Sequence, residues 1–212
     1  MDKIAVVDYG MGNTSSVLMA IHKVGGKAIL TSNENLISES KKIILPGVGS
    51  YSSGMAELKK RKLDKSILKA VKNGSYLLGV CLGMQMLFQE SHENKLTSGL
   101  RLIDGKVDKI PHLKKNKPIR KIPHIGWNRL LKKNNNWSKT ILSGIDDKTF
   151  FYYVHSYMAL PEDSLNVIAT CDYLDLEIPS VVVKDNVCGI QFHPENSSEQ
   201  GLKIYKNFFD LN

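Results

Sequence analysis

The feature of this sequence that most constrains its fold is a cysteine between two glycines, in the stretch Gly79-Val80-Cys81-Leu82-Gly83. Residues 76–80 are a short apolar run after the turn-forming pair Asn73-Gly74, which predicts a buried strand. From Leu82 onward the apolar residues follow helical spacing, so Cys81 lies at a strand-to-helix turn. A nucleophile at such a turn has a strained backbone, and side chains two positions before and after it would collide with neighbouring elements. The two glycines therefore predict that Cys81 is a nucleophile.

The alternative interpretation is that Cys81 is a small buried hydrophobic residue, as most free cysteines are. The helix predicted to follow it, extending to about Glu93, would direct its N-terminal N–H groups and dipole at the sulfur, which favours the reactive thiolate.

Cys171 and Cys188 have no such elbow, and we interpret both as packing residues. Three cysteines in 212 residues do not make a disulfide framework, so we expect a cytoplasmic location.

Strand–helix alternation organises the first half of the chain. Apolar runs predict strands at residues 3–8, 27–30 and 42–45, and amphipathic spacing predicts helices at residues 14–24, capped by Thr14 or Ser15, and at residues 58–72. This alternation predicts an α/β fold with a mostly parallel sheet and helices on both of its faces.

The second half of the chain has a different pattern. After Gly99, short β-prone stretches follow one another, as in residues 150–157, 167–171 and 180–184, before a final helix at about residues 198–209. We expect antiparallel hairpins that extend the parallel core. No linker or repeat separates the halves, so a single domain is predicted over residues 1–212.

Two glycine-containing loops follow predicted strands. Gly10-Met11-Gly12 lacks the third glycine and the later acidic residue of a dinucleotide-binding turn, so no nucleotide site is expected there. Pro46-Gly47-Val48-Gly49 leaves backbone N–H groups unshielded at the carboxyl end of a strand, where open α/β sheets bind ligands. Such amides stabilise a developing oxyanion, and beside Cys81 we favour this role over an ordinary turn.

The stretch Gln191-Phe192-His193-Pro194-Glu195 contains a possible base and its orienting acid. In an extended segment, residues two apart point to the same side, and Pro194 biases His193 toward an extended conformation. The Glu195 carboxylate can then accept a hydrogen bond from one imidazole nitrogen, which leaves the other nitrogen to take a proton. Alone this motif would be a surface turn, but together with an elbow cysteine it predicts a nucleophilic triad.

The net charge of +8 raises the question of an anionic partner. Basic residues cluster at positions 59–62 and 114–121, but neither cluster alternates with aromatic residues, so a solvated face is favoured over nucleic-acid binding. Docking to an acidic partner, or to a phosphorylated substrate shared with one, stays open. No apolar run reaches the roughly 20 residues of a membrane helix, and the first residues lead directly into a strand, so no signal peptide is expected.

These motifs together resemble the class I glutamine amidotransferases, which hydrolyse glutamine with a Cys-His-Glu triad on a flavodoxin-like fold. The resemblance spans nearly the whole chain and is strongest to the glutaminase subunits of imidazole glycerol phosphate synthases. It rests on the cysteine and histidine motifs and on four further blocks: Asp8-Tyr9-Gly10-Met11-Gly12-Asn13, Leu45-Pro46-Gly47-Val48-Gly49, Pro123-His124-Ile125-Gly126-Trp127-Asn128 and Tyr153-Val154-His155-Ser156-Tyr157.

The resemblance implies a role for each matching residue. Cys81 would be the nucleophile, His193 the base and acid, and Glu195 the orienter, with the amides of Leu82 and Val48 forming the oxyanion hole. Further residues would hold the substrate L-glutamine or face a partner subunit. The substrate-binding set is Gly49, Gln85, Glu93, Ser156 and Tyr157, and the partner-facing set is Asn13, His124, Trp127 and Asn196.

The resemblance further implies the reaction and its partner. Glutamine would be hydrolysed through a Cys81 thioester without metal or organic cofactor. The ammonia would pass to a (β/α)8-barrel cyclase subunit that makes imidazole glycerol phosphate and an aminoimidazole carboxamide ribotide in histidine biosynthesis. The family usually has lysine where this chain has Asn196, so a paralogue that feeds a partner modifying a surface-polysaccharide sugar is the alternative. A solitary cysteine peptidase of the same fold and a non-catalytic regulatory binder are further alternatives.

Overall fold

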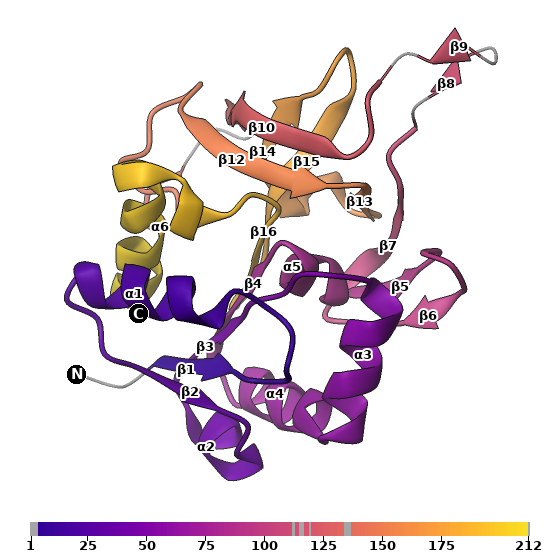
Figure 1. Cartoon of the computed structure of the whole chain (residues 1–212). Helices are drawn as coiled ribbons and strands as arrows, with labels where there is room; N and C mark the ends of the chain where they lie inside the picture. Colours follow the sequence, from indigo (N-terminus) through magenta and orange to yellow (C-terminus); the bar gives the residue numbers. More distant parts are fainter. Residues whose placement is uncertain (1–3, 112, 115–116, 119, 134–136, 212) are drawn as a thin grey trace.

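The computed structural model describes residues 4–111, 113–114, 117–118, 120–133 and 137–211. Within these residues the core is an eight-stranded sheet in the order β11-β14-β15-β16-β4-β3-β1-β2 (Figure 1). Strands β2, β1, β3, β4 and β16 run parallel, and β15, β14 and β11 continue the sheet antiparallel. Their bounds are β1 Ile4–Val7, β2 Ala28–Thr31, β3 Lys42–Leu45, β4 Tyr76–Val80, β11 Leu131–Lys132, β14 Val167–Asp172, β15 Glu177–Lys184 and β16 Val187–Ile190. The predicted parallel sheet with an antiparallel extension is confirmed.

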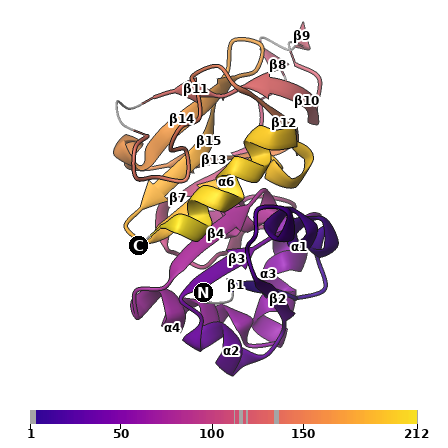
Figure 2. The ribbon, with the colours of Figure 1, turned by 90° about the vertical axis from the view of Figure 1, so that its left-hand side faces the viewer.

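Helices cover both faces of the parallel part. On one face lie α1 (Thr14–Lys23) and α6 (Ser198–Asp210), and on the other lie α2 (Glu34–Glu39), α3 (Tyr51–Lys60) and α4 (Leu63–Lys72), as Figures 1 and 2 show. Because side chains alternate along a strand, β1 supplies both layers: Ile4 and Val6 belong to the core under α1 and α6, and Val7 to the core under α3 and α4. None of the helices in the described part of the chain has the length and apolar character needed to cross a bilayer.

The single helix predicted for residues 58–72 is wrong, because the structure has two helices there, α3 and α4. Lys62 between them has a left-handed backbone with φ 57°. Leu58 and Leu63 are both fully buried, yet they are five residues apart, so a straight helix would turn one of them away from the sheet. The cap of α1 is also different from the prediction, since the Asn13 side chain accepts a hydrogen bond from the Ser16 amide.

The helix after Cys81 is shorter than predicted. Helix α5 covers only Leu82–Met86, and the chain then forms β5 (Phe88–Ser91) instead of continuing to Glu93. Side chains from Leu82 to Phe88 are all buried, so no polar face marked the end of the helix. Strand β5 enters a second sheet with the order β13-β7-β5-β6, in which β6 is Thr97–Ser98, β7 is Ile103–Lys109 and β13 is Tyr157–Pro161.

A separate antiparallel pair lies above the carboxyl ends of the parallel strands (Figure 1). It consists of β10 (His124–Arg129) and β12 (Phe150–His155). A short ribbon of β8 (Leu113–Lys114) and β9 (Lys117–Pro118) projects from this end of the molecule. The basic cluster at residues 114–121 lies partly outside the described residues. The remaining elements are the 3-10 turns η1 (Ser164–Asn166) and η2 (Pro194–Asn196).

Candidate active site

Cys81 lies in the sharp turn between β4 and α5, with φ 54° and ψ −108°. The two flanking glycines allow this turn. A Cβ on Gly83 would lie 1.8 Å from the carbonyl oxygen of Leu45, and one on Gly79 would lie 2.7 Å from the backbone of Gly83. No side chain fits at either position, so the predicted steric reason for both glycines is confirmed.

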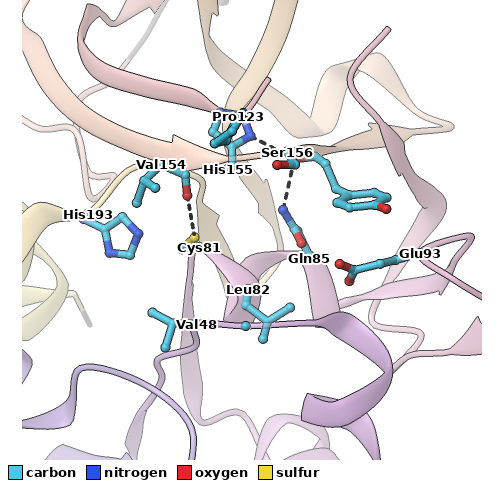
Figure 3. A pocket seen from close by; sticks show the side chains of 12 residues that line it. Val48, Cys81, Leu82, Gln85, Glu93, Pro123, Val154, His155, Ser156 and His193 are labelled. Carbon is cyan, nitrogen blue, oxygen red and sulfur yellow. Dashed lines mark hydrogen bonds between the residues drawn. The ribbon is translucent and has the colours of Figure 1, made fainter. Parts of the chain in front are cut away.

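A cavity of about 450 Å³ opens beside Cys81 at the carboxyl ends of the parallel strands (Figure 3), a volume typical of small-molecule sites. It brings together most of the predicted residues and adds Pro123, Val154 and His155, which the sequence interpretation did not single out. Its lining is Val48, Gly49, Cys81, Leu82, Gln85, Glu93, Pro123, Val154, His155, Ser156, Tyr157 and His193.

Glu195 lies behind His193 rather than in the cavity wall. Its Oε1 is 2.8 Å from His193 Nδ1, and both side chains are almost fully buried. The predicted extended arrangement is wrong for Glu195, since Pro194 starts the 3-10 turn η2, but the turn still brings the two side chains together. His193 Nε2 is buried and has no hydrogen-bond partner among the described residues, and Figure 3 shows the ring beside the Cys81 sulfur. The arrangement is that of a nucleophile, a base and an orienting carboxylate.

Tyr205 of α6 completes this side of the site, and the sequence interpretation missed it. Its hydroxyl donates a hydrogen bond to Glu195 Oε2 at 3.1 Å, so both carboxylate oxygens are engaged. Burial and the nearby carboxylate raise the pKa of Tyr205 well above its usual value, which keeps the hydroxyl protonated as a donor. A tyrosine on the buried face of a predicted helix was the available signal, because a buried hydroxyl needs a partner.

The electrostatics of His193 suit proton transfer. Burial lowers the pKa of His193, but the nearby Cys81 sulfur and Glu195 carboxylate outweigh it and raise that pKa to about 10. The imidazole therefore holds a proton at neutral pH. The His193 backbone is fixed to β12 by its N–H bond to the Tyr152 carbonyl, and by Ser197, whose hydroxyl donates to the His193 carbonyl.

The predicted oxyanion loop packs directly on the elbow. A Cβ on Gly47 would lie 2.9 Å from the Gly83 nitrogen, and the Tyr9 hydroxyl donates to the Pro46 carbonyl at 2.9 Å. Val48 follows in this loop, and both Val48 and Leu82 line the cavity beside Cys81. The loop thus borders the cavity beside Cys81, and its role as a donor to a developing oxyanion stays a prediction.

The predicted substrate residues differ in how they are held. Gln85 lines the cavity, but its Nε2 already donates to the Tyr157 carbonyl at 3.1 Å and to Gln191 Oε1 at 3.0 Å (Figure 3 draws the first bond). Glu93 accepts a hydrogen bond from the Tyr51 amide at 2.5 Å, which fixes its carboxylate at the start of α3. Burial, together with the Glu93 charge, raises the pKa of Tyr157.

The predicted partner-facing residues are not all at the surface. Asn13, Trp127 and Asn196 are exposed. His124, at 2% exposure, is buried between the rings of Tyr153 and Tyr173, so the prediction that it faces a partner is wrong. The alternation of β10 explains this, because His124 and Trp127 are three positions apart in the strand and so point to opposite faces.

His124 forms a buried pair with His155. Its Nδ1 lies 2.9 Å from His155 Nε2, and His155 Nδ1 lies 2.8 Å from the Tyr157 carbonyl oxygen. Burial lowers the pKa of His124 to about 4. Burial is also the main cause that lowers the pKa of His155 to about 3. Both imidazoles are therefore neutral at neutral pH, in contrast to His193.

The two remaining cysteines are packing residues, as predicted. Both are buried, and burial raises the pKa of the Cys171 thiol to about 11 and that of Cys188 to about 12. Neither is placed to act as a thiolate. No cluster of His, Cys, Asp and Glu with the arrangement of a metal site occurs in the part of the chain that the structure describes.

Comparison with known proteins agrees with this geometry. The family model for glutamine amidotransferase class-I matches residues 5–211. The imidazole glycerol phosphate synthase subunit HisH of Geobacillus sp. (strain WCH70) is 41% identical over 98% of this chain and 96% of its own. The HisH subunit of Geobacter sulfurreducens is 39% identical over 100% of both chains. Among solved structures, PurLQS from Thermotoga maritima shares the fold, with a TM-score of 0.75 at 21% identity over 99% of both chains. The chain therefore belongs to the class-I glutamine amidotransferase family, within the group of HisH-type synthase subunits.

Proposed function

We propose that this chain hydrolyses glutamine to glutamate and ammonia, with Cys81 as nucleophile, His193 as base and acid, and Glu195 as the orienting carboxylate. The observation that carries the assignment is the convergence of an elbow cysteine and the unpartnered Nε2 of His193 at one cavity, with Glu195 holding the opposite ring nitrogen. Cys81 lies far from His193 and Glu195 in the sequence, yet the fold brings the three together in the arrangement that nucleophilic acyl transfer requires.

In the first half-reaction the Cys81 thiolate attacks the side-chain amide carbon of glutamine. The carbonyl oxygen becomes an oxyanion beside the Leu82 and Val48 amides, which stabilise its charge. The His193 imidazolium then gives its proton to the amide nitrogen, the carbon–nitrogen bond breaks, and ammonia leaves a glutamyl thioester on Cys81. The raised pKa of His193 supplies this proton at neutral pH.

In the second half-reaction neutral His193 takes a proton from water as the water oxygen attacks the thioester carbon. The carbon–sulfur bond breaks, glutamate is released, and the thiolate–imidazolium pair is restored. Glu195 stabilises the imidazolium in both halves and keeps the ring directed at the sulfur, with Tyr205 fixing the second carboxylate oxygen. This scheme uses only protein groups and water.

The rest of the cavity fits the amino-acid end of glutamine. The Glu93 carboxylate provides a negative charge for the substrate ammonium, and the walls at Gly49, Ser156 and Tyr157 provide backbone polar groups. Gln85 shapes the wall between Cys81 and Tyr157.

The exposed face of the β10–β12 pair is the proposed docking surface for the second subunit. Its outward side chains pair across the strands as Ile125 with Val154, Trp127 with Tyr152 and Arg129 with Phe150. Trp127 is 51% and Ile125 57% exposed, a large apolar area for a free surface. We propose that the partner is a (β/α)8-barrel cyclase that accepts ammonia directly and makes imidazole glycerol phosphate. The names of the HisH relatives, which describe those proteins as subunits of imidazole glycerol phosphate synthase, support this proposal. We place the reaction in the cytoplasm.

Asn196 favours a second candidate for the acceptor. It is exposed at the end of η2, next to Glu195, at the position where the resemblance to the family implies lysine. A partner enzyme that adds nitrogen to a surface-polysaccharide sugar would keep the glutaminase chemistry and change only this contact.

Replacement of the nucleophile tests the proposal. In the complex with its partner, Cys81→Ala should abolish glutamine-dependent product formation and leave ammonia-dependent formation intact. Retained glutaminase activity in Cys81→Ala would contradict the assignment, and Cys188→Ala is the matched control that should keep both activities.

The identity of the acceptor is tested by purifying the complex from the native cell and assaying it for cyclase activity. A steady peptidase rate of the chain alone would favour a solitary hydrolase instead.

A further inference from the structure

We propose that Gln191 is a positioning residue whose side-chain amide holds one N–H on the Cys81 sulfur. The inference rests on the proposed role of Cys81 and adds a residue that the nucleophile–base–acid arrangement does not contain. Gln191 follows β16 at position 191 and is fully buried. Its Nε2 lies 3.7 Å from Cys81 Sγ, within hydrogen-bonding distance for sulfur.

Gln191 contacts the sulfur from the protein interior. It does not line the cavity that Cys81, His193 and Gln85 share, so it is not placed to touch bound glutamine. The thiol itself is directed at the Val154 carbonyl at 3.9 Å, on the cavity side. Gln191 is therefore placed to act on the ionisation and direction of the sulfur and not on substrate affinity.

The orientation of the Gln191 amide is determined by its neighbours. A backbone carbonyl only accepts hydrogen bonds, so Gln85 must present its NH2 group to the Tyr157 oxygen. The same NH2 group faces Gln191 Oε1 at 3.0 Å. With its oxygen held there, Gln191 must present its own NH2 group to the sulfur. A rotated amide would place oxygen beside the sulfur and nitrogen beside nitrogen.

The buried pair of His124 and His155 also holds the Tyr157 carbonyl, the group to which Gln85 donates. Because the Tyr157 carbonyl accepts from His155 Nδ1, neutral His155 has an unprotonated Nε2, which must accept from His124 Nδ1. The unprotonated His124 Nε2 then faces the Asn128 amide at 3.5 Å. Each hydrogen bond in the series from Asn128 to the Cys81 sulfur therefore has one possible donor and one possible acceptor. The Tyr157 carbonyl oxygen is the point where two donors, His155 and Gln85, converge.

An N–H donor beside the sulfur favours the charged nucleophile over the neutral thiol. Hydrogen bonds to charged groups are about twice as strong as those between neutral groups, and their loss changes rates by roughly 10- to 100-fold. The donor also restrains the position of the sulfur.

Two near-isosteric substitutions test the proposal in the full-length chain. Gln191→Met keeps the volume and removes the donor, and Gln191→Glu places a carboxylate beside the sulfur. We expect kcat to fall about 10- to 100-fold in Gln191→Met and further in Gln191→Glu, with the KM for glutamine nearly unchanged. Alkylation of Cys81 by iodoacetamide should slow about tenfold at about pH 7 and become equal to wild type at about pH 9.5, where the thiolate forms without the donor.

The controls separate positioning from a general structural role. Cys188→Ala perturbs packing on β16 without contacting the sulfur and should leave alkylation unchanged, and Cys81→Ala gives the background alkylation. Equal alkylation of Gln191→Met and wild type at both pH values, or an equal fall at both, would overturn the proposal. If Gln191→Met does not fold, Gln85→Met removes the N–H donor that holds Gln191 Oε1 and so orients the Gln191 amide, and it should show the same pH-dependent slowing. Alkylation needs no turnover, so this result stands apart from the glutaminase assay of Cys81→Ala.

Discussion

Around Cys81, glycines admit backbone contacts that no side chain would allow, whereas around His193 the geometry is held by hydrogen bonds between side chains of distant elements. The elbow brings the Gly83 backbone against Leu45, so its shape is set by contacts of van der Waals distance. The histidine side depends on Glu195, Tyr205 and Ser197, whose bonds can be removed one at a time. We therefore expect substitutions of the elbow glycines mainly to lower the stability of the fold, and substitutions around His193 mainly to lower the rate of catalysis.

The largest effect is expected at Gly83. A Cβ there would lie 1.8 Å from the Leu45 carbonyl oxygen, so Gly83→Ala must displace the elbow or β3. We expect the free energy of unfolding in urea to fall by about 3 kcal/mol or more. Gly74→Ala is the control, because Gly74 has φ 91° but nothing within 4 Å of the added Cβ, and should lose only about 1–2 kcal/mol. Similar losses in both variants would contradict a steric origin.

On the histidine side, Glu195→Gln should leave the fold intact and abolish most of the turnover. The amide keeps the shape but neither carries the charge that stabilises the His193 imidazolium nor fixes one orientation of the ring. We expect kcat for glutamine hydrolysis to fall by about 10³-fold in a protein that still folds. A fall of less than about tenfold would show that Glu195 does not orient the base.

The buried pair of His124 and His155 and the catalytic His193 should give opposite dependences of stability on pH. The pKa values of His124 and His155 are depressed to about 4 and about 3, so below about pH 6.5 the unfolded chain binds protons that the folded chain does not. These two residues therefore lower the free energy of unfolding as the pH falls from about 6.5 to 4, by up to about 1.4 kcal/mol per pH unit each.

His193 has the opposite sign. Its pKa is raised to about 10, so its contribution to stability is complete below about pH 6.5 and is lost as the pH rises toward 10. Urea unfolding across this range checks both statements. His124→Phe, which retains a ring between Tyr153 and Tyr173, should flatten the acid side, and His193→Gln should flatten the alkaline side. If the unfolding free energy of His124→Phe falls as steeply below about pH 6.5 as that of the wild type, the buried histidine pair does not cause the acid dependence.

The smallest effect is expected for Tyr205→Phe, which removes one hydrogen bond to Glu195 Oε2 and keeps the ring in the core. Loss of this bond should lower kcat about three- to tenfold and the unfolding free energy by about 1 kcal/mol. Steady-state kinetics with glutamine measures the first value. A drop as large as that of Glu195→Gln would mean that the tyrosine does more than fix the carboxylate.

The same comparison explains what the sequence could predict. The elbow, the loop at Gly47 and the fold class depend on local patterns of glycine and hydrophobic periodicity, and these were predicted with the strand Tyr76–Val80 at its observed bounds. Tyr205 and the partners of Gln85 depend on contacts between residues far apart in the chain, which no local spacing encodes.

The incorrect predictions, of two helix ends and of the exposure of His124, have related physical causes. The break between α3 and α4 and the early end of α5 follow from how buried side chains meet the sheets, and a uniformly buried stretch has no polar face to mark its helix end. His124 was predicted to face a partner because it lies in the same block as Trp127, but the alternation of the strand places the two side chains on opposite faces.

Trapping of the covalent intermediate is the most direct test of Cys81 as the nucleophile. Wild-type protein mixed with glutamine and quenched in acid within one turnover should carry one glutamyl group, and peptide mapping by mass spectrometry should locate it on the sulfur of Cys81. The adduct should be absent in Cys81→Ala. Hydrolysis of glutamine that proceeds with no adduct on Cys81, or with the adduct on another side chain, would contradict the account.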